Sequence, residues 1–394
     1  MQLDQLAVMN KKALTYETHN QQALFEPSLN FFNKAENEAD ETRPLYLFAG
    51  KMSIARLISM LFIVWGHSLL GWEHMRFKSI DYQILQAVIL EAGKIGTLGF
   101  FLITGYFLGD KIQNYTVPGF IKRRFFTLLL PWCIFLFLFV LAIFLETFPY
   151  NSVEQFNIRD TLKLLIKLTG YSIFYSVYWF VPTSVISVII LIFFKKYVKT
   201  LWFGTFLAFL TLFYCINLYF GWVAENHTKS VFAYIFFIWV GFKLKNNEGI
   251  IQSFLKRFSW RGILPAASLL FFAACFEGIM LMKSGSSDPF STVRFSNIIF
   301  SILIFLALLK TEKLNWVNKL QPRQYVYGIY LVHCIILNLF LIVLKHFVTN
   351  PLDIGHLGKS MILQVSFFLI VFLFSYFVVF LIRNSKLKFA IGSN

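Results

Sequence analysis

The chain has 394 residues, of which 57% are hydrophobic, 19% aromatic and only 14% charged. This composition excludes a single soluble domain, because a globular surface would run out of polar side chains to cover so much apolar material. The formal net charge of +16 does not indicate a nucleic-acid partner, since the Lys and Arg residues lie between apolar runs rather than along one groove interleaved with aromatic residues. The partner that the composition predicts is membrane lipid.

The two ends of the chain differ from its middle. Residues 1–45 are polar and contain an acidic run but no apolar signal sequence, which predicts a cytoplasmic N-terminal tail that is disordered or a short amphipathic helix. Residues 46–385 are expected to form one membrane domain, and residues 386–394 a short cytoplasmic tail. The four cysteines lie in apolar segments without metal-ligand spacing, so we expect no metal site.

Long apolar runs recur through the membrane domain, and a helix needs about 20 apolar residues to cross the hydrocarbon. The expected fold is all-α, a polytopic bundle of about ten transmembrane helices. The amphipathic stretch 160–177 is expected to lie in the membrane interface. The predicted spans are 54–72, 83–109, 125–146, 178–194, 201–223, 231–243, 262–282, 293–309, 325–347 and 361–382, with 231–243 the least secure because it is short.

Ten spans with both termini in the cytoplasm agree with the distribution of positive charge. Every loop that this topology places inside carries at least as many Lys and Arg residues as its outside neighbours, as the positive-inside rule requires. The loops near Asn226 and Ser286 are then expected to face outward.

Arg56 and His67 both lie in the first predicted span, where charged groups are expensive and therefore candidates for function. Their spacing of eleven positions returns to nearly the same helix face and separates them by roughly 16 Å along the axis. An arginine near the cytoplasmic mouth can bind phosphates, and a deeper imidazole can handle a proton or an acyl group. The alternative for Arg56 is a positive-inside anchor, and for His67 a hydrogen-bonded structural residue.

Motifs further along the chain complete a pattern. The segment Arg56-LISMLFIVWG-His67 is followed by GTLGFFLITGYFLGD from Gly96, FIKRRFFTLLLPW from Phe120, YWFVPTS from Tyr178 and YGIYLVH from Tyr327. In their order and spacing these motifs resemble the acyltransferase-3 family of integral membrane proteins. The chain departs from the family pattern at three positions: Thr104 replaces Ser, Leu98 replaces a Pro, and Thr127 replaces a second Arg.

The resemblance implies a membrane O-acyltransferase of the cell membrane that moves an acyl group, expected to be acetyl, from cytoplasmic acyl-CoA to a hydroxyl of a cell-surface or lipid-linked glycan. It implies acyl-CoA as the donor substrate and no bound cofactor. His67 is the expected catalytic residue, as general base or as acyl acceptor. The expected acyl-CoA-binding residues are Arg56, Arg124 and Arg123, and the expected pocket residues are Thr104, Gly105, Tyr106, Trp179 and His333.

Each of these secondary assignments has a structural alternative. Arg123 and Arg124 belong to a basic run that membrane orientation alone explains. Thr104 and Gly105 can serve helix packing, and Trp179 can belong to an aromatic belt at the membrane surface. His333 is expected either to line the cavity between the helices as a polar group or to be a packed histidine bonded to a neighbouring helix, and the sequence favours neither.

Glu91 is the second catalytic candidate. By helical rise it lies at nearly the depth of His67, so it could orient the imidazole and stabilise its charged form. A pair with Lys94 at helical i,i+3 spacing is the alternative.

Two other classes of protein remain open at this point. A multi-pass transporter or flippase for a lipid-linked sugar would also use a polar pocket between spans, although neither paired broken helices nor an internal repeat is evident. A non-catalytic membrane subunit of a glycan enzyme is the third possibility.

Overall fold

The fold is that of a computed structural model, which describes residues 48–69, 79–147, 157–224, 230–347 and 357–392. The predicted N-terminal tail, 1–45, and the loop near Asn226 lie outside the described residues. The chain divides into two compact units, Met1–Lys51 and Met52–Asn394, and the packing given below is that of the second unit.

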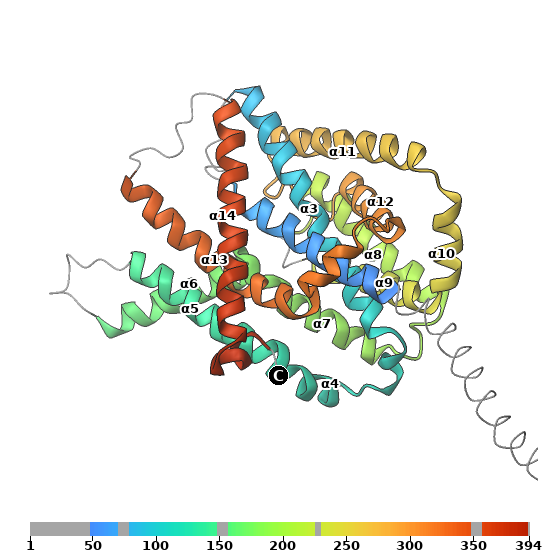
Figure 1. Ribbon diagram of the computed structural model, residues 1–394, viewed down its shortest axis with the longest axis horizontal. Helices are drawn as coiled ribbons and strands as arrows, with labels where there is room; N and C mark the ends of the chain where they lie inside the picture. The colour runs from blue at the N-terminus through green and yellow to red at the C-terminus, as the bar shows by residue number, and fades with distance from the viewer. Residues whose placement is uncertain (1–47, 70–78, 148–156, 225–229, 348–356, 393–394) are drawn as a thin grey trace, which may run out of the picture. The chain divides into compact units, whose positions relative to one another are not determined.

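The described residues form helices and no strand (Figure 1), as the composition predicted. Short 3-10 or π segments separate several of the helices. The helices are Phe48–His67, α3 (Ile80–Leu108), α4 (Val117–Arg124), α5 (Leu130–Thr147), α6 (Ile158–Tyr175), α7 (Phe180–Phe193), α8 (Leu201–Phe220), α9 (Val231–Asn246), α10 (Glu248–Arg257), α11 (Trp260–Lys283), α12 (Phe295–Lys310), α13 (Pro322–Phe347) and α14 (Leu357–Arg383).

Seven helices of the described chain are long and apolar enough to cross a membrane, or eight if the bent pair α6 and α7 is one span. Each of the ten predicted spans falls in a helix, but α9 and α12 have only 16 residues each. A helix of that length reaches about 24 Å, less than the roughly 30 Å hydrocarbon core. The chain is therefore a multi-pass membrane protein, whereas the count of ten spans and the cytoplasmic position of both termini stay predictions.

The first span is shifted relative to its prediction. Residues 54–72 were expected, but the helix covers Phe48–His67 and ends at the histidine. The backbone N–H and the side-chain hydroxyl of Ser68 both donate to the carbonyl oxygen of Val64, at 2.9 and 2.7 Å, which satisfies the last turn. His67 thus terminates the helix instead of lying inside it.

The stretch predicted to be interfacial, 160–177, is helical and largely coincides with α6. α6 packs against α5 and meets α7 at an angle of 71°, across the short turn Val177–Trp179. The turn begins at Ser176, whose side-chain oxygen accepts a hydrogen bond from the backbone N–H of Tyr178. The depth of α6 relative to the bilayer stays a prediction.

Glycines bring α3 close to its neighbours. A Cβ atom built on Gly105 would lie 1.8 Å from the carbonyl oxygen of Ile238, and one on Gly241 would lie 2.0 Å from that of Leu102. α3 and α9 therefore touch backbone to backbone, which is how helices associate in membranes. On another face of α3, a Cβ on Gly96 would lie 2.3 Å from the Ser59 carbonyl oxygen of the first helix.

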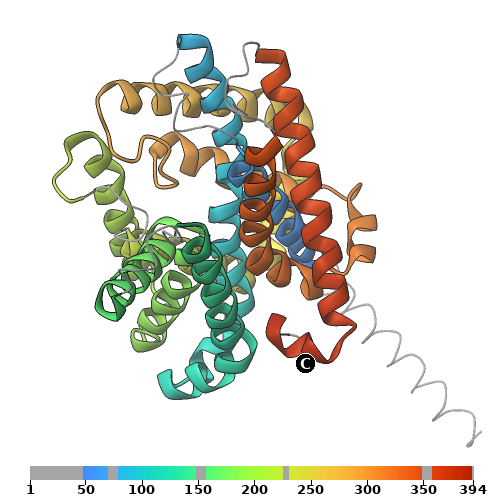
Figure 2. The ribbon, with the colours of Figure 1, turned by 90° about the vertical axis from the view of Figure 1, so that its left-hand side faces the viewer.

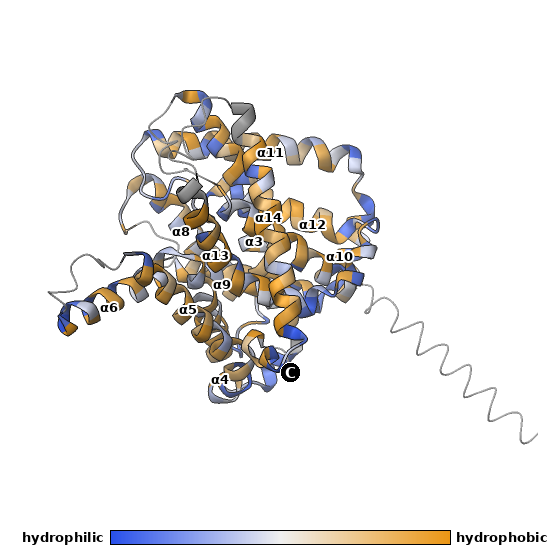
Figure 3. Cartoon of the chain, turned by 60° about the vertical axis from the view of Figure 1, so that its left-hand side comes forward, coloured by the Kyte–Doolittle hydropathy of each residue, from blue (hydrophilic) through white to orange (hydrophobic). Residues whose placement is uncertain are grey.

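Hydrophobic residues make up most of the length of several spans, which are largely orange in Figure 3. Only 22% of the most apolar stretch of each of three helical segments is buried inside the protein, and these segments are Val117–Thr147, Trp260–Lys283 and Met361–Arg383. These surfaces are consistent with contact to lipid, since lipid tails leave such side chains without a hydrophobic penalty.

The end of the chain turns back onto the helices. α13 packs along α14, and after α14 the 3-10 segment Lys386–Ile391 contacts α14, α13, α5 and the π segment Phe125–Leu129 (Figure 2). The predicted short tail 386–394 is thus ordered through Gly392, and two of its residues reach the candidate site.

Candidate active site

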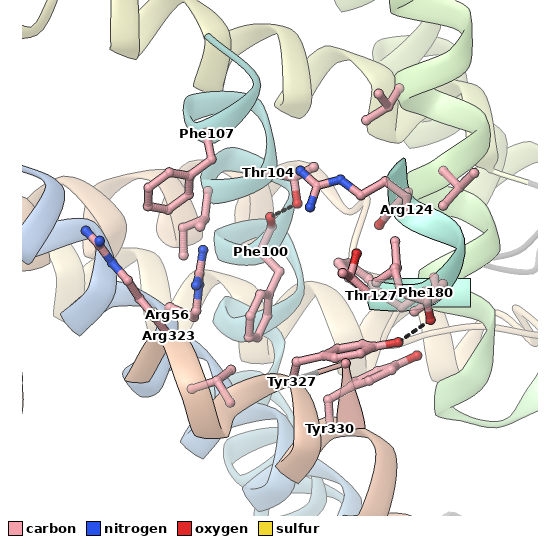
Figure 4. A pocket seen from close by; sticks show the side chains of 18 of the residues that line it. Arg56, Phe100, Thr104, Phe107, Arg124, Thr127, Phe180, Arg323, Tyr327 and Tyr330 are labelled. Atoms are coloured by element: carbon pink, nitrogen blue, oxygen red, sulfur yellow. Dashed lines mark hydrogen bonds between the residues drawn. The ribbon is translucent and has the colours of Figure 1, made fainter. Parts of the chain in front are cut away.

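A cavity of about 530 Å³ lies between the first helix, α3, the α4–α5 segment, α7 and α13. Figure 4 shows Arg56 and Arg323 on one side of it, next to Phe107, and Arg124 on the other. Thr104 and Phe100 of α3 lie between the two sides, and Tyr327 and Tyr330 lie below them. The walls are mostly apolar apart from these arginines, two threonines, Ser184, Gln324 and the tyrosines.

The three arginines give the cavity a concentrated positive charge. Arg56 and Arg323 both approach the ring of Phe107, with guanidinium carbons 4.8 and 5.9 Å from its centroid, and the Nε of Arg323 donates to the Ser53 hydroxyl at 2.9 Å. Among the described residues, neither Arg56 nor Arg124 pairs with a carboxylate. Three guanidinium groups around one cavity favour a ligand with several anionic groups, and guanidinium groups suit phosphates in particular.

Arg124 reaches the cavity because of an irregular helix. α4 is capped by Thr116, whose hydroxyl oxygen accepts from the Gly119 N–H, and it runs into a π-helical turn, Phe125–Leu129. Pro131 lacks the N–H that an α-helix would donate to the carbonyl of Thr127, which favours the wider turn. The carbonyl of Leu128 instead accepts from the Tyr327 hydroxyl at 2.6 Å. Arg123 is exposed over the Tyr115 ring and does not line the cavity.

Of the three predicted pocket residues on α3, only Thr104 lines the cavity. Its hydroxyl donates to the carbonyl of Phe100 at 2.8 Å and keeps lone pairs for a ligand. Gly105 lies in the backbone contact with α9, and the hydroxyl of buried Tyr106 donates to a carboxylate oxygen of Glu248 at 2.7 Å. Gly105 and Tyr106 therefore serve packing and a separate polar contact.

Aromatic rings connect the cavity to the two histidines. Tyr327 and Tyr330, one turn apart on α13, both line the cavity, and their ring centroids are 6.1 Å apart. The ring of Tyr330 lies 6.3 Å from that of His333, which lies 5.8 Å from that of His67. Neither histidine lines the cavity itself, but a row of neighbouring rings leads from cavity residues Tyr327 and Tyr330 to His333 and then to His67.

The two imidazoles differ in environment. His333 is fully buried, and its Nδ1 lies 2.8 and 3.1 Å from the carbonyl oxygens of Tyr330 and Ile329 in its own helix. Those acceptors assign the proton of neutral His333 to Nδ1, and the lone pair of Nε2 faces the thiol of Cys334 at 3.6 Å. His67 is exposed at the end of its helix, opposite to Arg56. A molecule approaching that end can therefore reach His67.

Glu91 has a partner that neither sequence interpretation considered. Its carboxylate binds the guanidinium of Arg294, and both side chains are fully buried. On α3, Ile89 and Gly93 face the first helix through Trp65 and Gly66, and Glu91 lies two residues from each, on the opposite side. This geometry does not support a role for Glu91 in orienting His67.

Arg294, at the start of the predicted span 293–309, was counted among the outside positive charges, but the structure buries it completely. Besides Glu91, its side chain donates to the carbonyl oxygens of Ala274 and Ser291 at 2.8 and 3.1 Å. These acceptors and the Glu91 carboxylate compensate the desolvation of the guanidinium. Arg294 therefore joins α3, α11 and α12 rather than anchoring a loop.

Trp179, predicted either to stack on an acceptor or to belong to an aromatic belt, is buried with 8% of its surface exposed. Its ring lies 5.4 Å from that of Tyr234 and 6.4 Å from that of Phe101. Trp179 stands next to cavity residue Phe180 and packs behind the wall.

Among the described residues, no group of three or more His, Cys, Asp or Glu side chains could hold a metal ion.

Sequence reasoning missed Arg323 as a site residue, because it treated this arginine as one more cytoplasmic charge. A signal was present. Arg323 precedes His333 by ten positions, almost the spacing of Arg56 and His67, so two helices each carry an arginine and, roughly 15 to 16 Å further on, a histidine. The structure brings the arginines together around Phe107 and the histidines within ring contact.

The fold and the site define a multi-pass helical membrane protein with an arginine-lined cavity between its helices. The model of a protein family described as an acyltransferase domain matches residues 51–384. It is the model of the acyltransferase-3 family, which the sequence motifs resemble. The chain belongs to this family, and acyltransferase activity is what the family implies in general. Neither the curated proteins nor the solved structures contain a significant match.

Proposed function

We propose that this protein transfers an acyl group, acetyl in the first instance, from cytoplasmic acyl-CoA to a sugar hydroxyl on the far side of the cell membrane. The observation that carries the proposal is the matched pair of arginines and histidines on the first helix and α13. A phosphorylated nucleotide fits the guanidinium groups, and a long flexible arm is needed to reach the imidazoles roughly 16 Å away. Acyl-CoA combines both features in one molecule.

In the proposed reaction, His67 is the general base. Its imidazole takes the proton of the acceptor hydroxyl while the hydroxyl oxygen attacks the thioester carbon. The new C–O bond forms, the C–S bond breaks, and the proton passes to the CoA sulfur, so the reaction needs no cofactor. Exposure of His67 at the end of its helix supports acceptor approach from the side opposite to the arginines. An acyl-histidine intermediate is the competing route.

Buried His333 is proposed to line the thioester end of the site and to hold its neighbour. Its Nδ1 donates to backbone carbonyls, so its Nε2 is the acceptor, and protonated His67 or a water molecule between the rings would replace the weak contact with the Cys334 thiol there. The centroid separation of 5.8 Å is compatible with either contact.

The acceptor proposal, a hydroxyl of a cell-surface or lipid-linked glycan, rests on the resemblance between the LITGYF segment of α3 and family members that modify glycans. The test is CoA release by purified protein given acetyl-CoA, with and without a glycan extract. Acceptor-stimulated release supports the proposal. Absence of both release and CoA binding would contradict it and favour a transporter or flippase for a lipid-linked sugar.

A further inference from the structure

α7 presents one polar residue to the cavity within an otherwise apolar stripe. Val181, Ser184, Val185 and Val188 line the cavity at i, i+3, i+4 and i+7, the spacing of a single helix face. Three positions of this stripe are valines, which offer a ligand only apolar contact. The hydroxyl of Ser184 is therefore the polar group of this wall.

The Ser184 hydroxyl is buried and unsatisfied. Ser184 is 8% exposed, and its Oγ has no hydrogen-bond partner among the described residues. A serine inside a helix commonly donates to the carbonyl four residues earlier, but Ser184 does not make that bond. A buried hydroxyl without a partner is costly, so its position in a cavity wall suggests a partner that arrives with a ligand.

The position of Ser184 along α7 indicates which part of the ligand it meets. Phe180, one turn earlier and about 6 Å along the axis, has its ring 6.0 Å from Tyr330, the ring next to His333. In the other direction α7 continues for about 14 Å to Phe193, beside the loop that carries Lys195. Ser184 thus lines the same cavity as the three arginines, one helical turn from the residue whose ring contacts Tyr330, and this is the part of the cavity where the proposed donor would place its pantetheine arm.

We propose that Ser184 binds an amide group of the pantetheine arm of acyl-CoA, so that the cavity recognises the arm as well as the phosphates. This inference rests on the proposed acyl-CoA donor. The hydroxyl can donate to an amide carbonyl and accept from an amide N–H, while the valines beside it contact the methylene and methyl groups of the arm. A ligand made of phosphates alone leaves Ser184 without a partner.

The test is binding of two probes, CoA and its bisphosphorylated adenosine half, which lacks the arm, to the wild type and to Ser184→Ala. The variant is expected to bind CoA roughly two- to tenfold more weakly, the range for one neutral hydrogen bond, and to bind the adenosine bisphosphate as the wild type does. Its melting temperature in detergent is expected to be equal or higher, because an unsatisfied buried hydroxyl is removed.

Ser187→Ala is the matched control. Ser187 is fully buried one turn away on α7 and its hydroxyl also lacks a partner among the described residues, but it does not line the cavity. It should gain the same stability without any change in CoA affinity. Equal CoA affinity in Ser184→Ala and wild type, or equal losses for CoA and adenosine bisphosphate, would overturn the role of Ser184. If the wild type itself binds neither probe, the proposed donor is wrong and the inference fails with it.

Discussion

The imidazole rings of His67 and His333 lie 5.8 Å apart, although 266 positions separate them in the sequence. Each histidine shares a helix with an arginine, and those arginines, Arg56 and Arg323, flank the same ring, Phe107. The first helix and α13 therefore bring their arginines together at one place and their histidines together at another. This arrangement relates the proposed binding site for the donor phosphates to the proposed site of proton transfer.

Arg323 is predicted to contribute to donor binding as much as Arg56. Arg323→Ala should raise the KM for acetyl-CoA roughly tenfold, the lower end for a charge-assisted contact at an exposed cavity mouth, with little change in kcat. Steady-state kinetics measure both. Arg383→Ala is the control, because Arg383 stacks over Tyr325 and binds Gln321 outside the cavity. Equal effects of both substitutions would indicate a general loss of surface charge.

The Glu91–Arg294 pair is predicted to stabilise the fold. Removing one partner of a buried pair commonly costs about 3–5 kcal/mol, so Glu91→Gln should lower the melting temperature in detergent. The double variant Glu91→Leu with Arg294→Met should recover much of that loss, because neither charge then remains buried alone. A Glu91→Gln protein that melts like the wild type but transfers no acyl group would contradict this structural role and indicate that Glu91 takes part in the reaction.

The end of the chain is predicted to form part of the donor site. Ile391 and Gly392 line the cavity, and Gly392 has a φ of +69° with its backbone against the Thr127 carbonyl. Gly392→Val should displace this segment and weaken CoA binding, since a Cβ would lie 2.3 Å from that oxygen. Gly285→Val, at φ +85° in open space, carries the same backbone strain of about 1–2 kcal/mol and should leave CoA affinity unchanged. Isothermal titration with CoA distinguishes the two.

The topology is tested by cysteine labelling in a chain in which exposed Cys133 is replaced by Ser. Ser286 is buried, so the outward loop is better probed at its exposed neighbour, as Ser287→Cys. Ser287→Cys should react with an impermeant maleimide in intact cells, and exposed Lys196→Cys only after permeabilisation. Labelling of Lys196→Cys in intact cells, with labelling of Ser287→Cys only after permeabilisation, would show that the protein has the opposite orientation in the membrane.

Local sequence pattern was sufficient for part of this structure. Apolar runs marked the helices, and the spacing of Arg56 and His67 placed both on one continuous helix because helical rise is regular. The end of that helix was misjudged by five residues, since the apolar residues after His67 continue the hydropathy signal while Ser68 closes the last turn.

Long-range pairing was not accessible in the same way. Arg294 follows a polar turn and reads as a loop charge, but its burial depends on Glu91, 203 positions earlier, and on the carbonyl of Ala274 in α11. The place of Thr104 in the cavity and of Gly105 in the α9 contact likewise depends on which face of α3 meets which helix. A single sequence shows these faces but not their partners.

The measurement that bears most directly on the central claim compares Arg56→Ala and His67→Ala for CoA binding and for acetyl transfer. Arg56→Ala should bind CoA roughly 10- to 150-fold more weakly and recover activity at high acetyl-CoA, because it loses a phosphate contact. His67→Ala should bind CoA nearly as the wild type and show no acceptor-dependent transfer at any donor concentration. Transfer by His67→Ala at the wild-type rate would contradict the assignment of the reaction centre and bring the transporter interpretation to first place.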